Sequence, residues 1–180
     1  MSSLRIPVST DDHSTGPDDA SVVLVEYGDY QCPYCGEAYP VVKKLLAELG
    51  DRVRFVFRNF PLAEMHPEAV DAAFVAEFAA SHGAFWEVHD MLYENQSRLG
   101  SPLYAEICAK LALPVADLRA AVQEQRYLSR IRTDEEGGIR SGVNGTPTFF
   151  LNGERLDGGT AELPDALRTA VQRASVQRAS

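Results

Sequence analysis

Hydrophobic residues near the start of the chain form two short runs with a helical pattern between them. Residues 22–27 are apolar until Glu26, as expected of a strand buried in the middle of a sheet. Residues 53–57 alternate in part between apolar and polar side chains, which predicts a second strand. Residues 33–49 carry apolar residues at helical spacing before Gly50, which predicts a helix that ends there. A helix that joins two such strands forms a right-handed crossover, so we expect the strands to be parallel.

The chain changes character from residue 62 to about residue 140. Apolar residues recur there at helical spacing, and no segment has the pattern of a strand. Proline and serine mark several helix starts, because proline fits the first turn and serine caps it. The helices are expected to begin near Pro67, Phe85, Ser101 and Pro114. A last helix is expected to end at Gly137-Gly138, so these residues form one all-helical block.

The strand pattern returns after the helical block. Residues 148–151 and 154–156 flank Asn152-Gly153, a residue pair that strongly favours a tight hairpin turn. A terminal helix is expected from about Leu163. The end of the chain repeats one five-residue sequence, and two copies are too few for a repeat architecture. We expect the second copy, residues 176–180, to form a frayed tail.

The composition is that of a globular protein, and it narrows the classes of function. Apolar residues make up 45% and charged residues 24% of the 180 residues, and the net charge is −9. The absence of a basic stripe argues against binding to nucleic acid, and no apolar stretch has the length of a membrane span. Residues 1–20 are polar and lack the apolar core of a signal peptide. We therefore expect a cytoplasmic protein as the sequence is written, or a periplasmic or exported one if a signal was removed.

The candidate chemistry is concentrated in Cys32-Pro33-Tyr34-Cys35. The motif follows the first buried strand and opens the next helix, which is the layout of a thioredoxin-type redox site. Two thiols at this spacing can form and break a disulfide in place. The free backbone N–H groups and the positive dipole end of the helix stabilise a thiolate. The thiolate is the species that attacks disulfides.

Two other interpretations of the cysteine pair are weaker. A zinc site needs a second pair of ligands, but Cys108 is the one remaining cysteine and no two histidines have the spacing of zinc ligands. We therefore expect no metal. A static structural disulfide is disfavoured because such bridges stabilise mainly by closing long loops, and this loop is very short. Cys108 lies on an apolar helical stripe and is interpreted as a core residue.

Each residue of the motif is expected to have its own role. Cys32 stands at the start of the helix, where the dipole acts most strongly, and is the expected nucleophile. Cys35 lies one turn further along and is expected to be shielded, as suits a resolving thiol. Pro33 removes a backbone N–H near the sulfur, and Tyr34 adds an aromatic ring and a hydroxyl, so both are expected to tune the site. The alternative for Tyr34 is an exposed aromatic residue with no such role.

Two further positions are candidates for the chemistry. Glu26 ends the first strand, and burial there would raise its pKa and let it accept or deliver the proton of Cys35. The alternative places Glu26 at the solvated end of that strand. Thr146-Pro147 precedes the hairpin, and an X-Pro bond at a tight entry to a strand is a candidate for the cis form.

Together these motifs resemble the DsbA-like branch of the thioredoxin superfamily over about residues 20–171. The resemblance rests on the following segments: Leu24-Val25-Glu26-Tyr27, Cys32-Pro33-Tyr34-Cys35, Phe60-Pro61-Leu62, His66-Pro67, Phe85-Trp86, His89-Asp90 and Gly142-Val143-Asn144-Gly145-Thr146-Pro147-Thr148-Phe149-Phe150. It implies a helical domain inserted after the βαβ half of a thioredoxin fold. It also implies that Pro147 is cis, lies against Cys32 and contacts the backbone of bound substrate. Glu26 would be the buried acid and Cys32 the attacking thiol.

The expected fold class is therefore α/β, a thioredoxin fold with an inserted all-helical domain. The expected organisation is a flexible arm over residues 1–19, a thioredoxin-like domain over residues 20–61 and 141–175, an inserted helical domain over residues 62–140, and a tail over residues 176–180.

The expected function is that of a thiol–disulfide oxidoreductase that exchanges disulfides with protein substrates through Cys32 and Cys35, with Thr146 and Pro147 contacting the substrate. We expect no bound cofactor, glutathione as a candidate co-substrate, and a redox partner whose identity stays open. The alternatives are a glutathione-coupled disulfide reductase and a non-catalytic binding or chaperone-like module that uses the cis-proline groove. The direction of electron flow stays open, because Tyr34 stands where exported oxidases of the family carry His. The oligomeric state, monomer or dimer, is also open.

Overall fold

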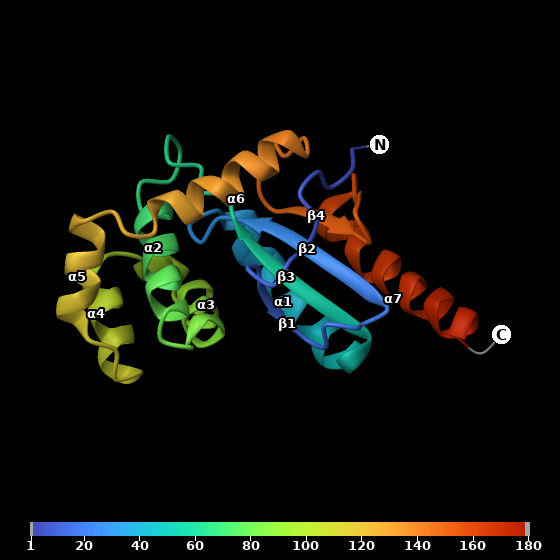
Figure 1. The fold of residues 1–180 in the computed structure, drawn as a ribbon, viewed down its shortest axis with the longest axis horizontal. Helices are drawn as coiled ribbons and strands as arrows, with labels where there is room; N and C mark the ends of the chain where they lie inside the picture. The colour runs from blue at the N-terminus through green and yellow to red at the C-terminus, as the bar shows by residue number, and fades with distance from the viewer. Residues whose placement is uncertain (1, 179–180) are drawn as a thin grey trace.

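The computed structural model describes residues 2–178 and shows a sheet flanked by helices (Figure 1). The strands are β1 (His13–Thr15), β2 (Val22–Gly28), β3 (Val53–Asn59), β4 (Thr148–Leu151) and β5 (Glu154–Arg155). The helices are α1 (Pro33–Leu49), α2 (Ala69–Ala80), α3 (Phe85–Glu94), α4 (Ser101–Lys110), α5 (Val115–Gln123), α6 (Leu128–Arg140) and α7 (Gly159–Arg178), with short 3-10 helices η1 (Gly50–Arg52) and η2 (Gln96–Arg98). The predicted α/β class with a helical insertion is confirmed.

The described strands form one mixed sheet in the order β1-β3-β2-β4-β5. β2 and β3 are parallel, as the crossover through α1 predicts, and their register pairs Glu26 with Phe57. β4 runs antiparallel to β2 on its other side and pairs Phe149 with Glu26. The turn at Asn152-Gly153 joins β4 to β5 as the predicted antiparallel hairpin. Glu26 therefore lies on a central strand, and its partner in each neighbouring strand is a phenylalanine.

Both faces of the sheet are covered. On one face, α1, α3 and α7 join the strands in a large buried cluster, which includes Val42, Leu92 and Leu167. On the other face, a smaller cluster forms around Tyr27 and Phe150, and α6 and the segment before β1 pack on it. Each face is thus excluded from water by elements from different parts of the chain.

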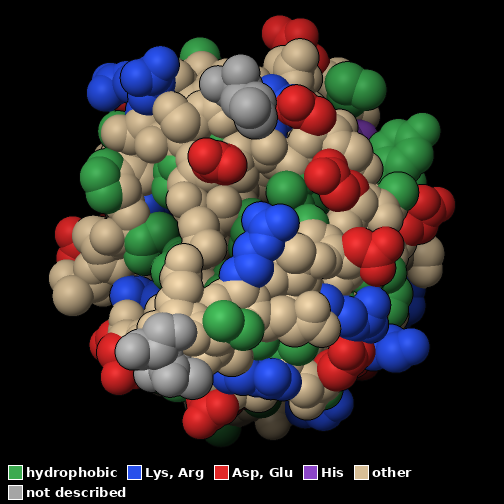
Figure 2. Space-filling view, turned by 90° about the vertical axis from the view of Figure 1, so that its right-hand side faces the viewer, with side chains coloured by type: hydrophobic (Ala, Val, Ile, Leu, Met, Phe, Trp, Pro, Cys, Tyr) green, Lys and Arg blue, Asp and Glu red, His purple; other side chains and the backbone are tan. Residues whose placement is uncertain are grey.

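The surface is dominated by charged and polar groups. The end of the molecule that lies to the right in Figure 1 carries basic and acidic side chains among scattered apolar ones (Figure 2). Large apolar side chains that are exposed elsewhere include Tyr34, Met65 and Ile139. Within residues 2–178, no helix has both the length and the apolar character needed to cross a membrane.

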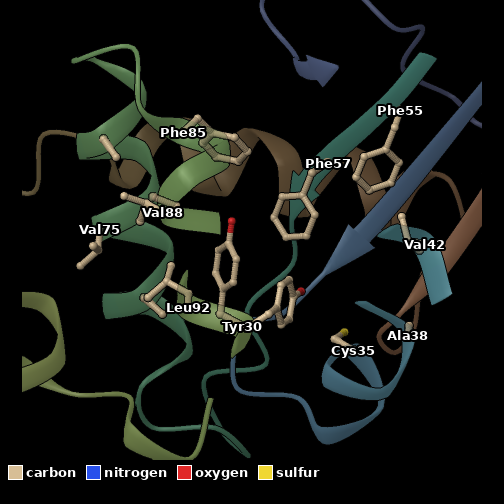
Figure 3. Packing of buried hydrophobic residues seen from close by; sticks show 14 of the residues in the cluster. Tyr30, Cys35, Ala38, Val42, Phe55, Phe57, Val75, Phe85, Val88 and Leu92 are labelled. Carbon is tan, nitrogen blue, oxygen red and sulfur yellow. The ribbon is translucent and has the colours of Figure 1, made fainter. Parts of the chain in front are cut away.

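The helical block shares its core with the sheet. Val88 and Leu92 of α3 lie in the same buried cluster as Cys35 of α1 (Figure 3). Tyr30, in the turn before α1, packs between the two parts, and its ring centroid lies 5.2 Å from that of Phe57 on β3. The block is therefore fixed against the side of the sheet that carries the two cysteines.

The N-terminal segment is not the flexible arm that the sequence suggested for residues 1–19. His13–Thr15 form β1, which extends the sheet antiparallel to β3. The reason is a buried ion pair: Arg58 of β3 donates two hydrogen bonds to the Asp12 carboxylate, at 2.7 and 3.0 Å. Arg58 also donates to the carbonyl oxygens of Ile6 and Pro7 at 2.9 and 3.1 Å. One arginine thus fixes the path of a segment that has little hydrophobic pattern of its own.

Helix α6 does not end at Gly137-Gly138, contrary to the prediction, but continues to Arg140. Glycine is required inside this helix because α6 packs very closely on the sheet. A Cβ atom on Gly138 would lie 2.8 Å from the ring of Phe60 and 3.0 Å from that of Tyr27. These glycines therefore mark a close contact between backbone and aromatic rings rather than a helix end.

The predicted tail at residues 176–180 is also wrong for its described part. Helix α7 begins at Gly159, earlier than the predicted start at Leu163, and extends to Arg178. The Glu162 side chain accepts a hydrogen bond from the backbone N–H of Gly158 at 2.9 Å, which supports the early start. Residues 179–180 lie outside the described residues.

We predict that Asp12→Ala lowers the free energy of unfolding by about 3 kcal/mol, because it leaves the buried Arg58 guanidinium without its carboxylate. Asp18→Ala is the matched control, since its carboxylate pairs with Arg54 but is 84% exposed. That control should cost less than about 1 kcal/mol. Urea denaturation followed by circular dichroism measures both. Equal losses in the two variants would contradict an anchoring role for Asp12.

Candidate active site

The start of α1 positions the two cysteines of the motif. Cys32 is the N-cap residue, and Pro33 follows in the first turn, where its missing N–H costs no hydrogen bond. The backbone N–H of Cys32 donates to the carbonyl of Asp29 at 3.1 Å and closes the turn after β2. Cys32 is 3% exposed and Cys35 is fully buried, and both are free thiols in this structure. Tyr34, by contrast, is 69% exposed.

The surroundings of Cys32 favour its thiolate. The hydrogen bond from the Cys35 thiol is the largest influence, and it lowers the pKa of Cys32 to about 5 against the opposing effect of burial. The backbone N–H groups of Tyr34 and Cys35 lower this pKa further. At neutral pH, Cys32 is therefore a thiolate at the start of a helix.

The surroundings of Cys35 have the opposite effect. Burial raises the pKa of Cys35 well above its ordinary value, and the hydrogen bond to Cys32 and the charge of Glu26 act in the same direction. Cys35 therefore keeps its proton at neutral pH. The two thiols are adjacent, and their environments place them in different protonation states.

Glu26 is buried beneath the cysteine pair. It is 3% exposed, so it does not lie at a solvated end of β2. Burial is the main cause that raises the pKa of Glu26 to about 8, and the negative charge of Cys32 adds to it. Its carboxyl group therefore titrates close to neutral pH and can exchange a proton with its surroundings.

The loop before β4 lies directly against Cys32. The Thr146–Pro147 peptide bond is cis, as the family resemblance implies. In the thiol form, Cys32 Sγ donates to the carbonyl oxygen of Thr146 at 3.3 Å. The Thr148 hydroxyl donates to the carbonyl of Gly145 at 2.7 Å and holds the loop in shape. Thr146 and Pro147 thus reach the cysteines although they are distant from them in the sequence.

Asp29 organises the turn before the motif, and the sequence analysis did not single it out. Its carboxylate accepts hydrogen bonds from the backbone N–H groups of Gln31 at 2.8 Å and Leu62 at 2.9 Å. It also contacts Nδ1 of His66 at 2.7 Å. Aspartate side chains often stabilise a turn by accepting a hydrogen bond from the backbone N–H two residues further on. The position of Asp29 between a strand and a helix could therefore have predicted this role.

Gln96 links the helical block to the motif. Its side-chain amide donates to the carbonyl oxygens of Tyr30 at 2.9 Å and Cys32 at 2.8 Å. The fit is close, since a Cβ atom on Gly36 would lie 2.4 Å from the Gln96 side-chain oxygen. No sequence pattern predicts the contact of Gln96 with the motif, because this contact depends on the position of η2 in the folded structure.

His89 is a neutral packing residue of the site. The Tyr30 hydroxyl and His89 Nδ1 are 3.0 Å apart. Burial is the main cause that lowers the pKa of His89 to about 3, so the ring is neutral at physiological pH. Its placement is that of a packing residue.

Cys108, the remaining cysteine, lies apart from this chemistry. Cys108 of α4 is fully buried among apolar side chains. Burial raises its pKa above the ordinary value, which makes it a poor nucleophile. Over the part of the chain that the structure describes, no group of three or more His, Cys, Asp or Glu side chains is arranged to hold a metal ion.

Comparisons with known proteins agree with the fold. The sheet and the paired thiols at the start of α1 define a thioredoxin-type protein. A family model described as thioredoxin matches residues 9–173, and the chain belongs to this family.

Several solved structures share this fold. The oxidised form of BdbD from Bacillus subtilis has a TM-score of 0.76 and 22% identity, over 89% of this chain and 93% of that one. A thioredoxin-like oxidoreductase from Silicibacter pomeroyi has a TM-score of 0.77 and 23% identity, over 93% and 94% of the two chains. Alpha-DsbA1 from Wolbachia pipientis has a TM-score of 0.77 and 17% identity, over 97% of both. At these identities the likeness concerns the fold.

Curated relatives of higher identity are much longer proteins. The chain is 44% identical over 156 residues to the Na(+)/H(+) antiporter NhaA 1 of Salinispora arenicola, which covers 86% of this chain and 24% of the antiporter. It is 39% identical over 149 residues to the antiporter of the same name from Mycobacterium sp. strain KMS, which covers 82% and 24%. The chain therefore spans about a quarter of the length of these relatives.

We predict that alkylation of Cys32 depends on pH with a midpoint near 5 and a plateau at neutral pH. Because the pKa of Cys32 is lowered in the folded state, its thiolate stabilises the reduced protein fully above the unfolded value near 9, and this contribution is lost as the pH falls through about 5. Iodoacetamide labelling read by peptide mass spectrometry gives the midpoint. Cys35→Ala, which removes the largest influence on this pKa, should raise the midpoint, and a midpoint near 9 in the unchanged protein would contradict the assignment.

Proposed function

We propose that this protein is a thiol–disulfide oxidoreductase that exchanges disulfides with protein substrates through Cys32 and Cys35. The observation that carries the proposal is the division of two adjacent thiols into a thiolate and a thiol within one helical turn. A lowered pKa makes Cys32 the nucleophile, and a raised pKa keeps Cys35 protonated and unreactive until the mixed disulfide has formed. The thioredoxin family membership supports the same chemistry.

The reducing direction consists of two exchanges. The Cys32 thiolate attacks one sulfur of a substrate disulfide, so a mixed disulfide forms, and the other substrate sulfur leaves as a thiolate that takes a proton from solvent. Cys35 then loses its proton and attacks the Cys32 sulfur. The Cys32–Cys35 bond forms, the remaining substrate sulfur leaves, and two electrons have passed from the pair to the substrate. The oxidation of a substrate dithiol is the same sequence in reverse.

Glu26 is the proposed base for the second exchange. Cys35 must be deprotonated in a buried environment, where its own pKa is far above neutral. The carboxyl group of Glu26 interacts electrostatically with both sulfur atoms and titrates near pH 8. It can therefore take the proton of Cys35 when the thiol attacks and return it when the pair is reduced again.

The loop at Thr146–Pro147 is the proposed contact for the substrate backbone. The carbonyl of Thr146 lies at Cys32, so an extended segment that brings a sulfur to Cys32 must run along this loop. A Cβ atom added to Gly145 would meet nothing within 4 Å, so the approach beside the loop is open. The exposed side chains of Tyr34 and Met65 provide apolar surface for such a segment. Pro33 and Tyr34 tune the thiolate in the same proposal.

No bound cofactor is needed for this cycle, because the dithiol itself carries the two electrons. Glutathione is a proposed co-substrate that reduces or oxidises the pair after each turnover. A dedicated glutathione-coupled reductase would accumulate a mixed disulfide with glutathione, whereas a protein-directed enzyme would accumulate one with a protein substrate. Trapping experiments therefore separate the two.

We predict that Cys35→Ala accumulates mixed disulfides at Cys32, because the intermediate forms but is not resolved. Cys32→Ala should form none at Cys35, whose thiol is buried and protonated. The measurement incubates each variant with a disulfide-containing protein and, separately, with oxidised glutathione, and identifies adducts by mass spectrometry.

Cys108→Ala is the control for this experiment and should exchange at the rate of the unchanged protein. Equal trapping at both cysteines would contradict the division of roles. Binding of unfolded protein without any adduct would instead favour a non-catalytic, chaperone-like module. Adducts with glutathione alone would favour the glutathione-coupled reductase.

We also predict an oxidising disulfide, because a stabilised thiolate at Cys32 stabilises the reduced pair. The reduction potential should be less negative than the roughly −270 mV of thioredoxin, and lie between about −230 and −120 mV. Glutathione redox titration followed by thiol alkylation measures it. A reduction potential as negative as that of thioredoxin, or more negative, would contradict this prediction and favour a dedicated reductase.

A further inference from the structure

The loop that joins β3 to α2 is tied to the turn before the cysteine motif. The backbone N–H of Leu62 donates to the Asp29 carboxylate at 2.9 Å, and Nδ1 of His66 lies 2.7 Å from the same oxygen atom. At the other end of this β3–α2 loop, the backbone N–H of Glu68 donates to the side-chain oxygen of Gln31 at 2.6 Å. The loop is thus fixed at both ends to the turn that leads into the motif.

Asp29 is the centre of these contacts. Its side chain is fully buried, whereas the His66 side chain is 14% exposed. An ionised carboxylate accepts hydrogen bonds but donates none, so Nδ1 of His66 carries the hydrogen and donates it. His66 therefore joins the N–H groups of Gln31 and Leu62 as a donor to this carboxylate. A buried carboxylate depends on such donors, because each one that it loses leaves part of its charge unsatisfied.

The main chain of Asp29 acts on both cysteines. Its carbonyl oxygen accepts a hydrogen bond from the backbone N–H of Cys32 at 3.1 Å, and its own N–H favours a thiolate at Cys35. Burial, the neighbouring Cys32 and the charge of Glu26 all raise the pKa of Cys35. The Asp29 N–H opposes them, and Tyr93 is a further titratable group that interacts with this sulfur. The position of Asp29 therefore influences how readily Cys35 becomes a nucleophile.

We propose that His66 is a positioning residue for the second exchange, because it holds Asp29 where its backbone N–H can stabilise the Cys35 sulfur. The inference rests on the proposed function. In the second exchange, the Cys35 sulfur loses its proton to Glu26, the proposed base, and forms a bond with the Cys32 sulfur. The substrate sulfur leaves with the electron pair of the broken bond. Negative charge develops on Cys35 at the start of this step, and a fixed N–H group that faces it lowers the barrier.

The two exchanges can be measured separately with an aromatic disulfide that releases a coloured thiolate at each step. The first release depends on the reagent concentration and reports the attack by Cys32. The second is intramolecular, independent of the reagent concentration, and reports the attack by Cys35. Stopped-flow absorbance gives both rate constants in one sample. Their ratio does not change when a variant is merely less stable, because a smaller folded fraction lowers the amplitude of both releases alike.

His66→Phe keeps an aromatic ring at this position but removes the donor. It should slow the second release about tenfold near neutral pH and leave the first within about twofold, because Asp29 loses a hydrogen bond to its buried charge. The pH midpoint of the second release should also rise, because the Cys35 thiolate is less well stabilised. His66→Asn keeps an N–H donor and loses the ring, and its second release should stay within about twofold of that of the unchanged protein.

Asp29→Asn tests whether His66 acts through Asp29. It keeps the shape of the side chain but replaces one acceptor oxygen with an NH₂ group, so it should slow the second release at least as much as His66→Phe. In this background, His66→Phe should add no further loss. His82→Phe is the matched control and should leave both releases unchanged, since Nδ1 of His82 lies 2.9 Å from the carbonyl oxygen of Phe78 in the helical block.

A normal second release in folded His66→Phe would overturn the proposed role, and so would a normal second release in Asp29→Asn if His66→Phe fails to fold. Equal losses in His66→Phe and His66→Asn would also overturn it, because the donor would then not be what matters. None of these results would affect the proposed function, because the unchanged protein would still give both releases. Failure of the unchanged protein to give the first release would instead remove the proposed function.

Discussion

The hydrogen bond between the two thiols is the interaction on which the site depends. It is the largest influence that lowers the pKa of Cys32, and the same bond helps to raise the pKa of Cys35. The bond persists only while Cys35 keeps its proton, and full burial of Cys35 enforces this. Removal of that proton both creates the second nucleophile and takes away the support for the first thiolate. Removal of this one proton therefore shifts the balance between the two sulfur atoms of the pair.

Three segments far apart in the sequence hold that bond in place. The turn after β2 is fixed by Asp29, and the loop before β4 brings Thr146 against Cys32. Gln96 of the helical block donates to the carbonyl of Cys32 from the third side. The insertion therefore stabilises the backbone of the motif as well as covering the sheet, and the site is complete only where the two parts of the fold meet.

The parts of this structure that follow from local pattern were predictable, and the parts that follow from long-range contacts were not. The buried run before Glu26 and the helical spacing after Cys32 predict β2, α1 and their place around the motif, because burial and periodicity are local. β1 was missed because it depends on Arg58, a residue on another strand, binding Asp12. Gly138 was read as a helix end because its real constraint, the ring of Phe60, is invisible in a single sequence. The role of Gln96 was missed for the same reason.

The position of the cavity gives the insertion a consequence beyond packing. A surface cavity of about 310 Å³ reaches the buried carboxyl group of Glu26. It occurs at the seam where α3 of the insertion meets α1 of the thioredoxin-like part, and its polar lining comes from both. Burial raises the pKa of Glu26 to about 8, and it also limits the contact of this carboxyl group with solvent. The cavity at the seam between α1 and α3 is lined by Glu26 and by the Lys43–Asp90 ion pair, whereas the neighbours of Glu26 along the sheet are Phe57 and Phe149.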